Sequence, residues 1–211
     1  MSLWATYYYI YPAQEQKQGV ALIDTNNQTI SVTISKSDWC LGAIEGTIRI
    51  ADESGAKKTF NYVDHKGTVQ VDCQAVLTVS KPWITATGKT RYTLAKGRFG
   101  DGVKGYVLLP YRTIAVDSRK IPFGSVIYIP RARGVTVKLP SGVDVKHDGY
   151  FFAADTGGAI KENHIDVFGG VSMTNPFPGF VKSNDKALFD AYLVNDEKIK
   201  EKLQNWQRNG G

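Results

Sequence analysis

Residues 151–170 read FFAADTGGAIKENHIDVFGG, and this stretch holds two aspartates, Asp155 and Asp166, among apolar and glycine-rich neighbours. The continuous apolar run before Asp155 predicts a strand that is covered on both faces. Asp166 lies inside a second short apolar segment. Aspartate is a poor strand former and is costly to bury without a partner. The stretch therefore predicts strands that carry carboxylates for a reason other than folding.

A third aspartate follows the same pattern, because Asp117 ends the apolar segment TIAV. If three carboxylates converge, their like charges cannot all ionise, and one pKa rises towards neutrality. A protonated carboxyl group is the usual donor to a glycosidic oxygen, so the pattern indicates carbohydrate chemistry. The alternative is that each aspartate caps a turn. That alternative stays open for Asp117 and Asp155 and is weaker for Asp166, which has no adjacent turn glycine.

Composition limits the class of protein. The chain has 211 residues, 42% of them hydrophobic and 22% charged, which is typical of a folded globular protein with one large or two small domains. A net charge of +6 favours anionic partners. Lysine and arginine are scattered, so nucleic acid is not an expected partner. No apolar run is long enough to span a membrane, and the N-terminus lacks the pattern of a signal peptide, which could have been removed.

Cysteine and histidine usage argues against a cofactor. Cys40 and Cys73 are the two cysteines, and they could form one disulfide or remain buried thiols. They have no metal-binding spacing, and neither do the three histidines, His65, His147 and His164. We expect no metal and no cofactor.

The chain divides by pattern into three parts. Residues 1–80 alternate short strand-like segments with polar turns and predict a β-rich region that packs on the next part. Residues 81–182 contain longer apolar strands joined by glycine and proline turns, which favours a closed barrel. Residues 183–211 show helical spacing at Leu188, Phe189, Tyr192 and Leu193 and again further on, and predict a helical segment. The fold class is mainly β.

Two segments carry a resemblance to a known family. TIAVDSRKIPFGSVIYIP, followed by AADTGGAIKENHIDVFGG, resembles the three-aspartate (3D) domain of the membrane-bound lytic transglycosylase A family and of related bacterial cell-wall and stationary-phase survival proteins. The resemblance covers roughly residues 83–170. It implies a six-stranded double-psi β-barrel. It also implies cleavage of peptidoglycan between N-acetylmuramic acid and N-acetylglucosamine, with formation of an anhydro end.

The same resemblance implies roles for individual residues. Asp166 corresponds to the catalytic acid and base, and Asp155 and Asp117 to the supporting pair. The resemblance also places a small nest of backbone donors in the saccharide groove. The residues of that nest are Thr156, Gly157, Gly158 and Lys161.

Three further residues are candidates for substrate binding, each with a simpler alternative. Tyr111 could stack on a sugar or pack in the core. Lys89 could bind a lactyl or peptide carboxylate, although a surface lysine is the simpler interpretation. Glu45 could be a second carboxylate in the cleft, against a solvent-facing strand residue. His164 is expected to be solvated in its turn.

These observations lead to a ranked set of hypotheses. The first is a peptidoglycan lytic transglycosylase in the cell envelope, periplasmic or secreted, whose partner is the glycan strand. The second is a wall-binding double-psi module without catalysis, because fold does not fix function. The third is a hydrolase, which would need a water activated by a second carboxylate. We expect Asp117, Asp155 and Asp166 to line one groove.

Overall fold

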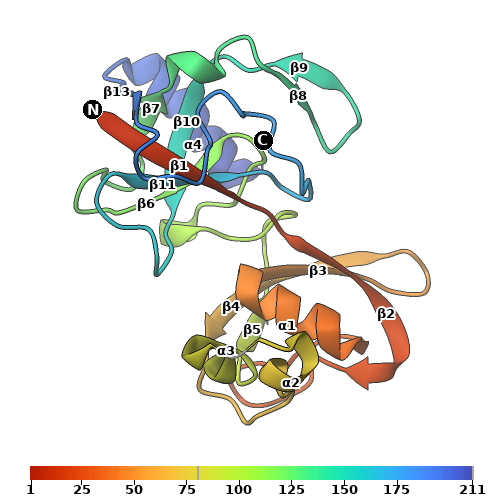
Figure 1. Cartoon of the computed structure of the whole chain (residues 1–211). Helices are drawn as coiled ribbons and strands as arrows, with labels where there is room; N and C mark the ends of the chain where they lie inside the picture. The colour runs from red at the N-terminus through yellow and green to blue at the C-terminus, as the bar shows by residue number, and fades with distance from the viewer. Residues whose placement is uncertain (80, 211) are drawn as a thin grey trace. The chain divides into compact units, whose positions relative to one another are not determined.

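The computed structural model describes residues 1–79 and 81–210, and the chain forms two compact units (Figure 1). Unit 1 combines Met1–Tyr9 with Asp101–Gly211, and unit 2 is Ile10–Gly100. The sequence predicts other boundaries, at residues 80 and 182. The first strand belongs to unit 1 although a whole unit separates it from its partners in the sequence. Such a long-range pairing leaves no mark in local sequence pattern.

Unit 1 is built on a mixed seven-stranded sheet in the order β12-β1-β11-β6-β10-β7-β13. The strands are β1 (Ser2–Tyr8), β6 (Thr113–Val116), β7 (Val126–Tyr128), β10 (Tyr150–Asp155), β11 (His164–Phe168), β12 (Phe189–Asp190) and β13 (Tyr192–Leu193). A separate hairpin joins β8 (Thr136–Lys138) and β9 (Asp144–Lys146), and two short 3-10 helices are η1 (Val103–Gly105) and η2 (Pro130–Ala132).

The central strands of this sheet are covered on both faces. All of β6 is buried, and the run Phe151–Ala154 in β10 is fully buried, as its continuous apolar sequence predicts. Side chains from alternate positions enter two separate apolar clusters: Phe151 packs with Ile114 and Phe177, whereas Phe152 packs with Tyr106 and Leu203. Unit 1 is therefore mainly β, as expected. Its sheet has seven strands where six are expected. Among the described residues the strand pairing ends at β12 and β13, and no ladder joins these two strands to close a barrel.

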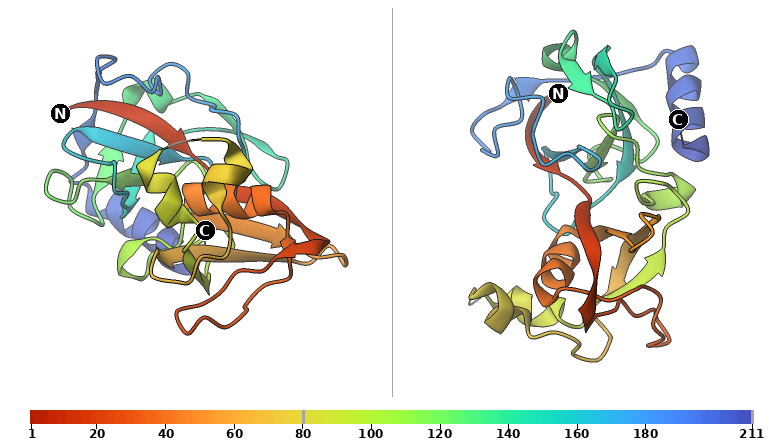
Figure 2. Two further views of the ribbon diagram at one scale, coloured as in Figure 1. Left: turned by 60° about the horizontal axis from the view of Figure 1, so that its bottom comes forward. Right: turned by 90° about the vertical axis from the view of Figure 1, so that its right-hand side faces the viewer.

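The predicted C-terminal helix is correct only in its second half. Helix α4 (Glu197–Asn209) begins at Asp196, whose side chain accepts a hydrogen bond from the Ile199 backbone N–H. The first half instead forms the two edge strands, in which Phe189 pairs with Leu3 and Tyr192 pairs with Tyr128. Short apolar runs fit helix and strand alike, and here the open sheet edges decide the outcome. Figure 2 shows α4 as a separate ribbon beside the strands of its unit.

Unit 2 packs three helices against a four-stranded sheet of order β2-β3-β4-β5. The elements are β2 (Tyr11–Val20), α1 (Lys36–Glu45), β3 (Thr47–Ala51), β4 (Lys57–Asp64), α2 (Cys73–Leu77), α3 (Pro82–Thr87) and β5 (Arg91–Leu94). Trp39, Tyr92 and Phe60 lie among the largest buried side chains of its core. Unit 2 thus has a hydrophobic core of its own.

Helix α1 forms where the sequence predicts a strand. The Ser35 hydroxyl accepts a hydrogen bond from the Asp38 backbone N–H, which caps the first turn, and Gly46 ends the helix with a φ of 81°. Cys40 of α1 and Cys73 of α2 are joined by a disulfide, with their Cα atoms 5.6 Å apart. The bond links the two helices directly. Across the described residues, every helix is too short or too polar to cross a membrane.

Candidate functional site

The pairing of strands in unit 1 places two of the predicted aspartates on either side of one residue. In β11, Asp166 lies opposite Ala115 of β6, and in β10, Asp155 is in register with the same Ala115. Neighbouring strands are about 4.8 Å apart, so the two aspartate backbones are separated by roughly 10 Å. The sheet therefore brings Asp155 and Asp166 together although neither strand pairs with the other.

Tyr8 of β1 is a functional candidate that the sequence analysis missed. Its hydroxyl donates a hydrogen bond of 2.6 Å to Oδ2 of Asp155. Burial raises the pKa of the Tyr8 phenol far above its usual value, and the charges of Asp155 and Asp166 raise it further. The hydroxyl therefore bonds the Asp155 carboxylate directly and interacts electrostatically with that of Asp166. A tyrosine-rich segment, ATYYYIY, is the only hint of it in the sequence, and nothing there assigns this segment to unit 1.

Asp155 has a carboxyl group with a raised pKa. Burial raises the pKa of its carboxyl group from 3.8 to about 6, against the opposing effects of hydrogen bonds from the Tyr8 hydroxyl and the Thr156 backbone N–H. The Thr156 bond is 2.8 Å long and reaches Oδ1. A carboxyl group with this pKa carries a proton in part of the molecules near neutral pH and can both donate and accept one.

Asp117 lies immediately after β6 and has a different environment. Its carboxylate is only 6% exposed and pairs with the Arg119 guanidinium at 2.6 Å. It also accepts a hydrogen bond of 3.0 Å from the Glu162 backbone N–H. The Arg119 hydrogen bond, followed by the Glu162 N–H, holds the pKa of Asp117 well below its usual range. Asp117 therefore stays charged and ties the segment after β6 to the loop that connects β10 and β11.

That connecting loop contains the predicted nest. Thr156, Gly158 and Lys161 are exposed, and a Cβ placed on Gly158 would meet no atom within 4 Å, so the space above it is open. A Cβ on Gly157 would come 3.0 Å from Ile160. The loop ends at Glu162, whose φ of 55° is uncommon for a residue other than glycine. The contact with Asp117 holds this strained residue in place.

The remaining predicted residues lie elsewhere. Tyr111 is 5% exposed and packs edge-to-face on Phe177, so most of its ring lies in the core. Glu45 and Lys89 both belong to unit 2. Glu45 ends helix α1 rather than lying in a strand, and burial raises the pKa of its carboxyl group. Lys89 lies between α3 and β5.

His164 is not solvated, contrary to the sequence interpretation. It is 7% exposed, and its ring stacks on Trp4 with centroids 3.6 Å apart. Its Nε2 lies 2.8 Å from the Thr6 hydroxyl oxygen. Both partners come from β1, which explains why the KENH turn looks exposed when read alone. The interaction fixes β1 against β11 two residues from Asp166.

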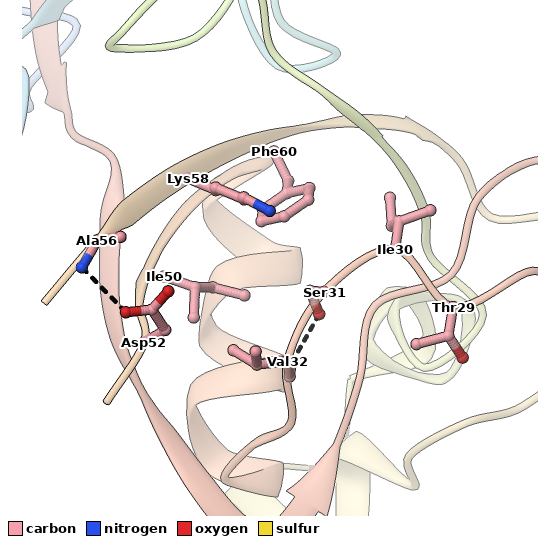
Figure 3. A pocket seen from close by; sticks show the side chains of 9 residues that line it. All are labelled: Thr29, Ile30, Ser31, Val32, Ile50, Asp52, Ala56, Lys58 and Phe60. Atoms are coloured by element: carbon pink, nitrogen blue, oxygen red, sulfur yellow. Dashed lines mark hydrogen bonds between the residues drawn. The ribbon is translucent and has the colours of Figure 1, made fainter. Parts of the chain in front are cut away.

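A cavity of about 260 Å³ in unit 2 contains none of the residues that the sequence predicts to be functional. Figure 3 shows its lining, in which Ile50 and Phe60 lie near Asp52 and Lys58. Asp52 accepts a hydrogen bond of 2.9 Å from the Ala56 backbone N–H, so its carboxylate stabilises the turn between β3 and β4. Among the described residues, no group of three histidine, cysteine, aspartate or glutamate side chains is arranged to hold a metal ion.

Known structures share this fold. A membrane-bound lytic murein transglycosylase from Agrobacterium tumefaciens has a TM-score of 0.52 at 14% identity, over 95% of this chain and 76% of its own. MltA from Neisseria gonorrhoeae has a TM-score of 0.51 at 13% identity, over 91% of this chain and 72% of its own. E. coli MltA with bound chitohexaose has a TM-score of 0.49 at 16% identity, over 81% of this chain. This chain spans 65% of that E. coli protein, which is less than two thirds.

The fold is thus the one seen in lytic transglycosylases of the MltA type. Residues 112–186 match the family model of the 3D domain, so the chain carries a 3D domain within unit 1. All three aspartates that the sequence singles out lie inside this match. No curated protein matches the sequence.

Proposed function

We propose that the protein is a peptidoglycan lytic transglycosylase. The observation that carries the proposal is the pair Asp155 and Asp166 on either side of Ala115, with a pKa of about 6 at Asp155. A net charge of +6 suits a substrate that carries lactyl and peptide carboxylates. The shared fold supports the same reaction class without deciding it.

In this proposal Asp155 is the acid and base, a role that the sequence resemblance implies for Asp166. Its carboxyl group donates a proton to the glycosidic oxygen as the bond to the anomeric carbon of the muramoyl residue breaks. The resulting carboxylate then accepts the proton of the muramoyl 6-hydroxyl, whose oxygen attacks that anomeric carbon and closes the anhydro ring. One group therefore serves both steps, and no water is consumed. Asp155 is assigned this role because burial raises its pKa to about 6, so its proton is available near neutral pH.

The other two aspartates take supporting roles. Asp166, on the far side of β6, supplies negative charge that stabilises the positive charge developing on the sugar. Asp117 stays ionised through Arg119 and holds the loop that carries Thr156, Gly157 and Gly158. The Thr156 N–H remains bound to Asp155, so the glycan is met by the backbone of Gly157 and Gly158, with open space above Gly158. Lys161 offers a charge beside it.

Mass spectrometry of the products released from purified sacculi tests the proposal. Wild type is expected to release anhydro-muropeptides. Asp155→Asn should release at least 100-fold less, because an amide cannot donate the proton that general acid catalysis requires. Asp166→Asn should retain measurable activity, because its amide still presents a dipole to the sugar. Asp148→Asn, at a carboxylate paired with Arg112 elsewhere in unit 1, is the matched control and should stay active.

Each contrary outcome points to a different function. Products with ordinary reducing ends would indicate a hydrolase. If wild type binds sacculi but releases nothing, the protein is a wall-binding module. An inactive Asp166→Asn beside an active Asp155→Asn would return the acid role to Asp166. Circular dichroism of each variant separates loss of chemistry from loss of fold.

Two finer features belong to the same proposal. We propose that the mixed sheet around β6, β10 and β11 is the greater part of a double-psi barrel, and an experimental structure that traces the closing hydrogen bonds tests this. We also propose a location in the cell envelope. The Cys40–Cys73 disulfide supports it, because disulfides persist in oxidising compartments.

A further inference from the structure

Two arginines of unit 2 share one aromatic ring. The Arg49 guanidinium carbon lies 5.5 Å from the centroid of the Phe99 ring, and that of Arg98 lies 5.3 Å from the same centroid. An aromatic ring attracts each cation by its quadrupole but carries no net charge. The ring therefore brings two positive charges together without neutralising either.

The backbone fixes this arrangement on one side of the unit 2 sheet. Ile48 and Ile50 of β3 point into the core, so Arg49 between them faces the other side. In the neighbouring strand, Thr59 pairs with Arg49 and its hydroxyl donates a hydrogen bond of 2.8 Å to the backbone carbonyl of Arg98. Strand pairing and this hydrogen bond hold both arginines beside the ring.

The two charges lack a carboxylate partner among the described residues. Burial lowers the pKa of Arg49 from its usual value, and the positive charge of Arg98 lowers it further. The Nε atom of Arg49 is buried and donates to no acceptor in the described chain. A buried donor without an acceptor is costly, and so are two like charges on one ring. An anion bound between the guanidinium groups would relieve both costs.

Other arginines of the chain have the carboxylate partner that Arg49 and Arg98 lack among the described residues. Three of them are each paired with an aspartate at hydrogen-bond distance, in the pairs Arg91–Asp64, Arg112–Asp148 and Arg119–Asp117. The guanidinium fork matches a carboxylate, which it can bind with two parallel hydrogen bonds. Arg49 and Arg98 therefore present the donors of such a pair with the acceptor still to be supplied.

We propose that Arg49 and Arg98, held on Phe99, form a binding site for a carboxylate of the substrate. The substrate class is a glycan that carries acidic lactyl-peptide groups, so this inference rests on the proposed function. It assigns to unit 2 the recognition of charged side groups. Lys89 is a candidate for that role from the sequence, with a surface lysine as the simpler interpretation.

Binding measurements by calorimetry test the site in an Asp155→Asn background, so that no probe is consumed. The probes are a purified tetrasaccharide muropeptide with free carboxyl groups and the same compound with those groups amidated. The free-acid probe should bind more tightly, and its affinity should fall with salt. Arg98→Gln and Arg49→Gln should each weaken its binding about tenfold, the usual value of a hydrogen bond to a charged group. Neither should change the binding of the amidated probe.

Lys17→Gln, which removes an exposed positive charge from β2 in the same unit, is the matched control and should alter neither affinity. Equal affinity of the two probes for the protein would overturn the proposal. So would an equal loss on both probes in Arg98→Gln, whose exposed side chain can be removed without opening the core. Inorganic phosphate that competes more strongly than acetate would overturn the choice of a carboxylate. These results do not depend on turnover, so a failed product assay and a failed binding assay are separate outcomes.

Discussion

At the scale of single residues, the candidate site includes a tyrosine that no local pattern marks. The sequence singles out all three aspartates as candidates because each one contradicts its apolar surroundings. Tyr8 fits its strand well, and its contact with Asp155 spans 147 residues of sequence. A residue that is unusual in its local sequence, such as an aspartate in an apolar strand, can be recognised from sequence alone. A residue that suits its strand and acts through a long-range contact can be recognised only from the structure.

Removing the Tyr8 hydroxyl should shift the pH dependence of activity. The hydrogen bond from Tyr8 lowers the pKa of Asp155, so in Tyr8→Phe that pKa rises above its value of about 6. The acid form then persists to higher pH, and the alkaline limb of kcat/KM should move up by roughly one pH unit, the equivalent of one hydrogen bond to a charged group. A pH profile of product release measures the shift. Tyr7→Phe is the control, because that hydroxyl donates to the backbone carbonyl of Ser172.

His147 should make the fold sensitive to mild acid. Its ring is 2% exposed, and burial, followed by the charge of Arg112, lowers its pKa from 6.5 to about 4. The Gly149 backbone N–H donates to Nδ1, so Nε2 carries the proton that is donated to the Tyr111 carbonyl. A lowered histidine pKa means that the unfolded state binds the proton first, so stability is complete above pH 6.5 and falls as the pH drops towards 4.

The size of this effect follows from the two pKa values. Between pH 7 and pH 5 the free energy of unfolding should fall by about 2 kcal/mol on account of His147. Urea titrations at the two pH values measure it, and His147→Gln should lose that part of the pH dependence. A His147 ring that titrates near 6.5 by NMR would contradict the expected lowering.

At the scale of elements, sequence pattern predicts the strands of the 3D domain better than the elements that flank it. The apolar runs before Asp117 and Asp155 become β6 and β10 because both faces of each strand are buried. The sequence pattern predicts a strand where helix α1 forms and a helix where the edge strand β12 forms. In both places a short apolar run is compatible with two structures, and a cap or a free sheet edge makes the choice.

The disulfide between α1 and α2 should contribute strongly to the stability of unit 2. It closes a sequence separation of 33 residues, for which the chain-entropy relation gives about 4 kcal/mol. Cys40→Ser with Cys73→Ser should lower the free energy of unfolding by that order in denaturant titrations. A reductant should do the same to wild type and nothing further to the double variant. Equal stability with and without reductant, with thiols confirmed free by alkylation, would contradict the assignment.

At the scale of the whole molecule, the mainly β class and the 3D domain follow from sequence, but the division into units does not. Residues 81–100 look like the start of the barrel region and yet belong to unit 2. Residues 2–8 look like part of the N-terminal module and yet pair with β11. Both differences from the predicted bounds arise because unit 1 is discontinuous in sequence. Local sequence pattern contains no signal that a late strand pairs with a much earlier one.

This discontinuity also bears on the order in which the protein can fold. The strand Ser2–Tyr8 leaves the ribosome before its parallel partner, His164–Phe168, which is made more than 150 residues later. Unit 2 is continuous from residue 10 to residue 100 and has its own core, so it can fold while the remainder of the chain is still being synthesised. The strand β1 cannot pair with β11 until that segment has been synthesised, so its backbone hydrogen-bonding groups stay without this partner until then. Such non-local pairing is slow, so this strand needs protection from aggregation until β11 has been made.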